Sequence, residues 1–101
     1  MEPSVQFINN QEKKRFEVDI NGYLAFMEYK LTNHGDLYIL YTEVPPELKG
    51  QGIATKMAAN VITLLQQNNW KLIPLCPFMA AYMERHPEFR FLISEKAKPR
   101  G

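Results

Sequence analysis

The sequence is poor in the residues that build disulfides and metal sites, and its charges nearly cancel. Its 101 residues include one cysteine and two histidines. A single cysteine cannot form an internal disulfide or an all-cysteine metal site, and no cluster of histidine, cysteine and carboxylates has metal-ligand spacing, so we expect no metal. A formal net charge of +1 gives no electrostatic footprint for nucleic acid or an anionic membrane surface. We therefore expect neither kind of partner.

Long hydrophobic runs are also missing. No apolar stretch approaches the roughly 20 residues of a membrane-spanning helix, and the opening MEPSVQF lacks the basic and apolar regions of a signal peptide. No internal repeat is present, and the 46% hydrophobic and 23% charged residues are ordinary for a globular domain. We expect one domain over residues 1–101, located in the cytoplasm, with the basic segment 95–101 as a flexible tail.

The first half of the sequence predicts antiparallel strands. Apolar and acidic residues alternate over Phe16–Ile20, as in a half-buried strand. The dipeptide Asn21-Gly22 then gives the strongest short hairpin signal, because both turn residues need a positive φ, and Tyr23–Leu31 is the partner strand. The nearly unbroken apolar run Leu37–Val44 predicts a strand that is buried on both faces. The segment Val5–Ile8 can add a short strand at the beginning.

The second half changes to helical spacing. From Ile53, apolar residues recur on one face as far as the pair Asn68-Asn69, which is a plausible left-handed stop. Trp70–Cys76 then predicts a short strand, and Pro77–Arg85 a second helix. The expected fold class is α/β of the α+β type, an antiparallel meander followed by strand, helix, strand and helix. Its last two strands, over 37–44 and 70–76, should be parallel neighbours.

The stretch VPPELKGQGIATKM, residues 44–57, lies between a predicted strand and a predicted helix. Pro45 and Pro46 remove backbone donors, so strand pairing cannot continue past Val44. Gly50 and Gly52 let the backbone approach a bulky anion closely. The amides from Gly50 to Ala54 should be free at the helix start, at the positive end of its dipole. This pattern predicts a phosphate-binding turn; the alternative is an ordinary strand-to-helix connection.

Two familiar nucleotide-binding motifs do not fit this turn. Thr55 stands where the dinucleotide motif needs its third glycine, and no acidic residue follows a matching second strand about 20 residues later. Lys56 is too far from the glycines to complete a P-loop. Binding of a nucleotide in either of these ways is therefore disfavoured.

A known family has a similar turn. The run KGQGIA, Lys49–Ala54, resembles the acetyl-CoA motif [RQ]-x-x-G-x-[GA] of the GNAT N-acetyltransferases. With IPLCPFMAAYMERHPEF after it, the chain resembles the small stand-alone branch of that family over Phe16–Phe91. Two positions depart from the pattern. Lys49 replaces the usual arginine or glutamine, and Tyr41 stands where the branch commonly has a histidine, which removes one possible proton acceptor.

The resemblance implies an enzyme that transfers an acetyl group from acetyl-CoA to an amine, whose identity the sequence does not give. It implies that pyrophosphate lies on the glycine loop and that pantetheine runs between the strands at 37–44 and 70–76, which splay apart. Pro74 suits a strand that diverges. The alternative is a non-catalytic CoA-binding or protein-interaction module that retains the phosphate-binding turn. The chain is short for this family, so the acceptor surface should be exposed or completed by a partner. The predicted cofactor-binding residues are Glu43, Val44, Lys49, Gly50, Gln51, Gly52, Ile53, Ala54, Thr55 and Tyr82.

Cys76 is the candidate catalytic residue. It precedes Pro77 and should cap the second helix, where the helix dipole favours the nucleophilic thiolate. It also lies at the open end of the expected parallel strand pair, where the acetyl thioester should arrive. Two alternatives remain. The cysteine can line the pocket while the amine attacks acetyl-CoA directly, or it can be a buried apolar residue.

Four further side chains have weaker claims. Tyr82 lies one helical turn after Phe78 and can either reach the pantetheine and the departing thiolate or pack in the core. His86 ends the second helix and is more easily explained as a cap than as a proton carrier. His34 falls in a predicted turn and should be solvated. Glu28 interrupts an apolar strand, so it is either a base for the amine or, preferably, an outward-facing charge.

Overall fold

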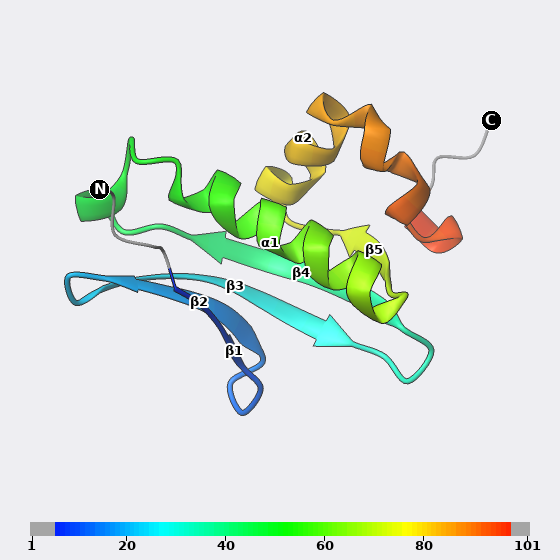
Figure 1. The fold of residues 1–101 in the computed structure, drawn as a ribbon, viewed down its shortest axis with the longest axis horizontal. Coiled ribbons are helices and arrows are strands. Elements are labelled where there is room, and N and C mark those ends of the chain that lie inside the picture. Colours follow the sequence, from blue (N-terminus) through cyan, green and yellow to red (C-terminus); the bar gives the residue numbers. More distant parts are fainter. Residues whose placement is uncertain (1–5, 98–101) are drawn as a thin grey trace.

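The computed structural model describes residues 6–97 as a five-stranded sheet with two α-helices packed on one face (Figure 1). The strands are β1 (Phe7–Asn10), β2 (Arg15–Ile20), β3 (Tyr23–Leu31), β4 (Asp36–Glu43) and β5 (Lys71–Pro74), the α-helices are α1 (Ile53–Asn68) and α2 (Pro77–Arg85), and the 3-10 helices are η1 (Pro46–Leu48), η2 (Pro87–Leu92) and η3 (Glu95–Ala97). The strand order follows the chain. Pairing is antiparallel from β1 to β4 and parallel between β4 and β5. The predicted fold class is confirmed.

The hairpin between β2 and β3 forms where its turn residues predict it. Asn21 and Gly22 both have positive φ angles, 54° and 84°. The register pairs Phe16 with Met27, and both side chains are completely buried. The alternation of β2 therefore places its apolar side chains toward the helices, as predicted. β1 begins at Phe7, and residue 5 of the predicted first strand lies outside the described part of the chain.

Helix α1 supplies most of the helical side of the core. It lies over the sheet alongside β4 in Figure 1, and its last residue is followed by Asn69 in the left-handed conformation (φ 57°), which confirms the predicted stop. The helix packs its apolar stripe against inward residues of the sheet such as Leu37 and Ile39. No helix in residues 6–97 is both long and apolar enough to cross a membrane. The buried residues of α1 are Ile53, Met57, Ala58, Val61, Ile62 and Leu65.

The prediction that β4 is buried on both faces is wrong. Leu37 and Ile39 are completely buried, but Leu40 and Tyr41 are 41% and 48% exposed. The physical reason is that both α-helices pack on the same face of the sheet, so the apolar run of β4 has a helix on one side only. On the opposite face, no α-helix of residues 6–97 covers the end of β4 that carries Leu40 and Tyr41 (Figure 1).

The first residues of the predicted flexible tail are held against the sheet. Glu95–Ala97 form η3, where the amide of Ala97 donates to the carbonyl of Ser94 at 2.9 Å. Lys96 Nζ donates to Asp36 Oδ2 at 2.7 Å, which ties η3 to the start of β4. Residues 98–101 lie outside the described part of the chain.

Acid should remove the stabilising contribution of this ion pair. The hydrogen bond from Lys96, followed by its charge, lowers the pKa of Asp36, although burial acts in the opposite direction. A carboxyl group with a lowered pKa stabilises the fold above its unfolded-chain pKa, about 3.9, and this contribution is lost as the pH falls through the folded pKa. The free energy of unfolding, measured by urea titration, should therefore fall less steeply with decreasing pH in the Lys96→Met variant than in the unmodified protein.

Lys56→Met is the control for this experiment, because Lys56 is an exposed lysine with no ion pair to residues 6–97. It should leave the acid decline unchanged. An equally steep decline in the Lys96→Met variant would contradict the assigned role of the pair.

Candidate functional site

The turn between β4 and α1 presents a run of backbone amides. Gly50 and Gly52 have φ angles of 82° and 70°, and Gly52 is the N-cap of α1. The first bond of the helix runs from Lys56 N to the Gly52 carbonyl at 3.0 Å. The amides of the preceding helical residues, Ile53 to Thr55, therefore have no acceptor in the helix, as at any helix start.

These amides border an open hollow of about 220 Å³. A Cβ atom placed on Gly50 or Gly52 would meet no atom within 4 Å. Glycine is thus required there by the left-handed backbone rather than by close packing, and the space beside it is free for a ligand. The α1 dipole and the exposed Lys49 both favour an anion in the hollow. The hollow is lined by Val44, Leu48, Lys49, Gly50, Gly52, Ile53, Ala54 and Thr55.

Most of the predicted cofactor-binding residues line this hollow, but three do not. Gln51 turns away and donates its side-chain amide to the Glu47 carbonyl at 3.3 Å. Glu43 is exposed at the end of β4, and Tyr82 is buried on α2. Leu48 also lines the hollow, although no sequence pattern marked it as a binding residue. It is 2% exposed and belongs to the core, so its apolar character marked it only as a packing residue.

The parallel strands β4 and β5 pair over four residues each and then separate. The predicted strand through Cys76 is too long, because β5 ends at Pro74. The amides of Leu75 and Cys76 both donate to the Ile39 carbonyl at 3.0 Å, and this shared acceptor marks the end of the parallel backbone pairing between the two strands. Since amides alternate along a strand, the missing N–H of Pro74 faces the edge of β5 away from β4, where Leu72 forms an isolated parallel bridge with Ile93. The ladder between β4 and β5 therefore loses no hydrogen bond at Pro74.

A bulge in β4 decides which side chains face this separation. The register pairs Tyr29 with Ile39 but Glu28 with Tyr41, so Leu40 is the extra residue. One inserted residue reverses the alternation, which turns Tyr41 outward and Thr42 toward the helices. Strict alternation from the inward-facing Ile39 would have placed them the other way. The sequence therefore gave no signal for Thr42 as a site residue.

Thr42 and Cys76 meet beside the separation. Thr42 Oγ1 lies 3.2 Å from Cys76 Sγ. Cys76 is the N-cap of α2, as predicted, and its sulfur accepts a hydrogen bond from the amide of Met79 at 3.3 Å. The residue is only 2% exposed. The thiol therefore lies beneath the surface, with one helix-start amide and one hydroxyl as polar neighbours.

The weaker candidates occupy different surroundings. Tyr82 is 6% exposed and its ring centroid lies 4.3 Å from that of His86. His86 is the C-cap of α2, and its Nδ1 lies 3.3 Å from Glu88 Oε2. His34 is exposed, as expected for a turn residue, and Glu28 is exposed on the outward side of β3. None of these side chains contacts Cys76 through a hydrogen bond in the described part of the chain.

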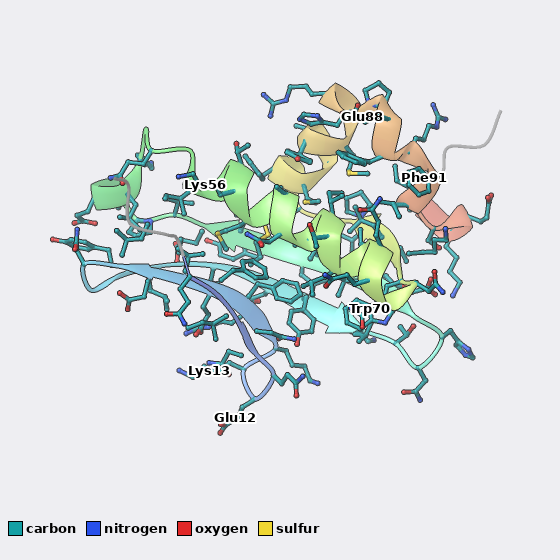
Figure 2. The ribbon with its side chains drawn as sticks, viewed as in Figure 1. Glu12, Lys13, Lys56, Trp70, Glu88 and Phe91 are labelled. Atoms are coloured by element: carbon teal, nitrogen blue, oxygen red, sulfur yellow. The ribbon has the colours of Figure 1, made fainter. Side chains whose placement is uncertain are left out.

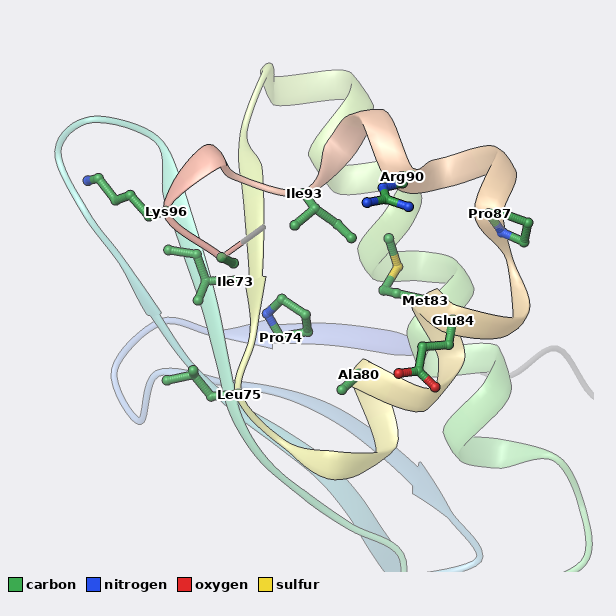
Figure 3. Close-up of a pocket in the computed structure, with 11 residues that line it drawn as sticks. Ile73, Pro74, Leu75, Ala80, Met83, Glu84, Pro87, Arg90, Ile93 and Lys96 are labelled. Carbon is green, nitrogen blue, oxygen red and sulfur yellow. The ribbon is translucent and has the colours of Figure 1, made fainter. Parts of the chain in front are cut away.

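A second, larger cavity of about 600 Å³ lies between β5, α2 and the 3-10 helices (Figure 3). Its α2 residues, Ala80, Met83 and Glu84, are spaced as neighbours on one side of that helix. The cavity is lined by neither Cys76 nor any residue of the β4–α1 turn. It is therefore distinct from the hollow at the start of α1.

The structure thus defines an α/β domain in which free amides at a helix start border an open hollow, beside a parallel strand pair that separates. The model of the GCN5-related N-acetyl-transferase family matches residues 15–92, and the chain belongs to this family. It is similar to "Protein NATD1" of Xenopus tropicalis, with 24% identity over 103 residues that cover 98% of this chain and 93% of that protein. A "GCN5-like putative N-acetyltransferase" from Staphylococcus aureus, solved by NMR, has a similar fold. The two structures have a TM-score of 0.70 and a sequence identity of 24%, and the match covers 89% of this chain and 88% of that chain.

Proposed function

We propose that the protein binds acetyl-CoA at the β4–α1 turn and transfers the acetyl group to an amine. The observation that carries the proposal is the set of free amides at the start of α1, which faces an open hollow beside two left-handed glycines. When bound, acetyl-CoA supplies an activated acetyl thioester. Transfer forms an amide bond, breaks the thioester C–S bond and leaves the proton of the amine on the CoA thiol.

The chain's own groups fit the phosphate end of this ligand. The amides of Ile53, Ala54 and Thr55 can donate to the pyrophosphate, and the positive end of the α1 dipole favours its charge. Val44 lies between this hollow and the end of β4, so its backbone can contact the pantetheine arm. Beyond it, the separation of β4 and β5 leads to Thr42 and Cys76.

Two routes of transfer are consistent with the site. In one, the amine attacks the thioester directly and Cys76 only lines the pocket. In the other, Cys76 first accepts the acetyl group and the amine then attacks acetyl-Cys76. The hydrogen bond from the Met79 amide fixes the sulfur at the start of α2, beside the separation of the strands, which supports the second route.

Binding and turnover test the proposal separately. A ligand that binds only the folded state stabilises it by about 2.7 kcal/mol at one hundred times its Kd. CoA and acetyl-CoA should therefore raise the melting temperature, and acetyl-CoA should be consumed with pooled amines and peptides. Tight binding without turnover would favour the non-catalytic module. An unmoved melting curve at millimolar CoA would contradict the phosphate-binding turn.

Lys49→Ala should weaken CoA binding severalfold at low salt. Lys49 is exposed and lines the hollow, so its charge can attract the phosphates without replacing the amides. Because such a charge is screened, the loss should shrink as salt is added, which titration calorimetry at two salt concentrations would show.

The matched control is Lys13→Ala. It removes the same charge from the turn between β1 and β2, away from the start of α1 (Figure 2). It should leave the affinity for CoA unchanged. Equal affinities of the Lys49→Ala variant and the unmodified protein at low salt would mean that Lys49 has no binding role.

A further inference from the structure

The outward face of the sheet carries a compact group of acidic and aromatic side chains. The register places Glu17, Phe26 and Glu43 in one row across β2, β3 and β4, and Arg15, Glu28 and Tyr41 in the next. We name these six residues the acidic-aromatic face. No helix within residues 6–97 covers them, since both α-helices pack on the opposite side of the sheet.

One end of the acidic-aromatic face already holds a cation of the chain itself. The guanidinium of Arg15 lies over the Phe26 ring, 4.6 Å from its centroid. Arg15 also forms an ion pair with Glu17. Stacking on an aromatic ring combined with a carboxylate is a favourable setting for a cationic side chain. The Arg15 contacts show that this surface accommodates one.

The other end of the face has the same two components, and no cationic side chain of residues 6–97 is paired with its carboxylates. The Tyr41 ring is 48% exposed and lies 6.1 Å from the Phe26 ring, centroid to centroid. Within residues 6–97 neither Glu28 nor Glu43 forms an ion pair. The charge of Glu43 is the largest cause that raises the pKa of Tyr41, ahead of burial, the hydrogen bond to Glu43 and the charge of Glu28. The surroundings of Tyr41 are therefore negative and attract a cation.

This unoccupied end lies next to the candidate acetyl-transfer site. Tyr41 and Thr42 are consecutive residues that the β4 bulge turns to opposite faces of the sheet. Thr42 Oγ1 lies 3.2 Å from Cys76 Sγ, and β4 has already parted from β5 at this level. A side chain that rests on the acidic-aromatic face therefore has the thiol directly across β4, beside the separation of the strands.

We propose that the acidic-aromatic face docks a basic, lysine-bearing segment of an acceptor protein, an inference that rests on the proposed function. Three carboxylates against one guanidinium give the charge complementarity, and the exposed Tyr41 ring offers a cation–π contact. The occupant is a protein segment because the surface is an open sheet face, whereas small ligands favour concave pockets. The hollow and the cavity described above are both lined by other residues.

Peptide binding without acetyl-CoA tests the docking step. The probe is a fluorescein-labelled peptide, Gly-Lys-Ser-Gly-Lys-Ser-Gly-Lys, compared with the same peptide in which glutamine replaces each lysine. The lysine peptide should bind more tightly than the glutamine peptide. The double variant Glu28→Gln, Glu43→Gln should weaken the affinity for the lysine peptide about three- to tenfold at low salt. The loss should shrink as salt is added. Tyr41→Leu should weaken binding as well, whereas Tyr41→Phe, which keeps the aromatic ring, should retain it.

The matched control is the double variant Glu12→Gln with Glu84→Gln. It removes two exposed carboxylates that lie off this face, in the β1–β2 turn and on α2. It should leave peptide binding unchanged. Equal binding of the two peptides, or an equal loss in the control variant, would overturn the proposal. A third result would also overturn it: spermine binds tightly and needs Glu28 and Glu43, but the lysine peptide does not bind. The occupant would then be a small polyamine.

CoA binding distinguishes this inference from the proposed function. Neither the Glu28 nor the Glu43 side chain lines the hollow, so the double variant Glu28→Gln, Glu43→Gln should retain the full thermal protection by CoA, which also shows that it is folded. Protection by CoA without selective peptide binding would overturn the docking face alone. Selective peptide binding without protection by CoA would overturn the proposed acetyl transfer and leave the docking face in place.

Discussion

Gly52→Val is expected to abolish the thermal protection that acetyl-CoA gives to the protein. Gly52 is the N-cap of α1 and has a φ of 70°. A Cβ atom at this position meets no protein atom within 4 Å, so the methyl groups of valine would enter the open space beside the free amides. In the proposed complex that space holds phosphate. Melting curves with and without acetyl-CoA would measure the loss.

The strain that valine introduces needs its own control, because a left-handed backbone costs an ordinary residue about 1–2 kcal/mol. Gly22→Val provides it. Gly22 has a φ of 84°, its added Cβ would also meet no atom within 4 Å, and it belongs to the β2–β3 hairpin rather than the hollow. Both variants should lose similar stability, and only Gly52→Val should lose the protection. Full protection of Gly52→Val would contradict the proposed location of the phosphates.

The sequence predicted the local features of this site because their causes are local. Residues that readily adopt a positive φ predicted both the end of α1, before Asn69, and the hairpin turn at Asn21-Gly22. The free amides at the start of α1 follow from helix geometry alone once Gly52 begins the helix. Cys76 was placed correctly at the start of α2, since proline at the next position favours the first turn of a helix.

The features that sequence reasoning missed depend on partners far away in the chain. The bulge at Leu40 exists only in the pairing of β4 with β3, and it alone turns Thr42 toward Cys76. The exposure of Tyr41 depends on which face of the sheet the helices pack against. An apolar run shows that a strand can be buried, but it does not show how many sides are covered.

Incubation with acetyl-CoA alone is expected to add one acetyl group to the protein at Cys76. In this step the thiolate attacks the carbonyl carbon, the C–S bond to CoA breaks, and CoA leaves as a thiolate that takes up a proton. Exchange between two thioesters costs little energy. The Met79 amide, 3.3 Å from Sγ at the start of α2, holds the sulfur in position for this attack. Intact-mass measurement should show the adduct, and Cys76→Ala should remove it.

Cys76→Ser separates the chemistry of the thiol from its structural role. A serine hydroxyl can accept the hydrogen bond from Met79 and contact Thr42 in place of the sulfur, so this variant preserves the cap that Cys76→Ala removes. Without an adjacent base a hydroxyl is a poor nucleophile near neutral pH, so the adduct and the transfer activity should both be lost. If no adduct forms and Cys76→Ser transfers acetyl at the full rate, the amine attacks acetyl-CoA directly and the buried cysteine serves only to line the pocket.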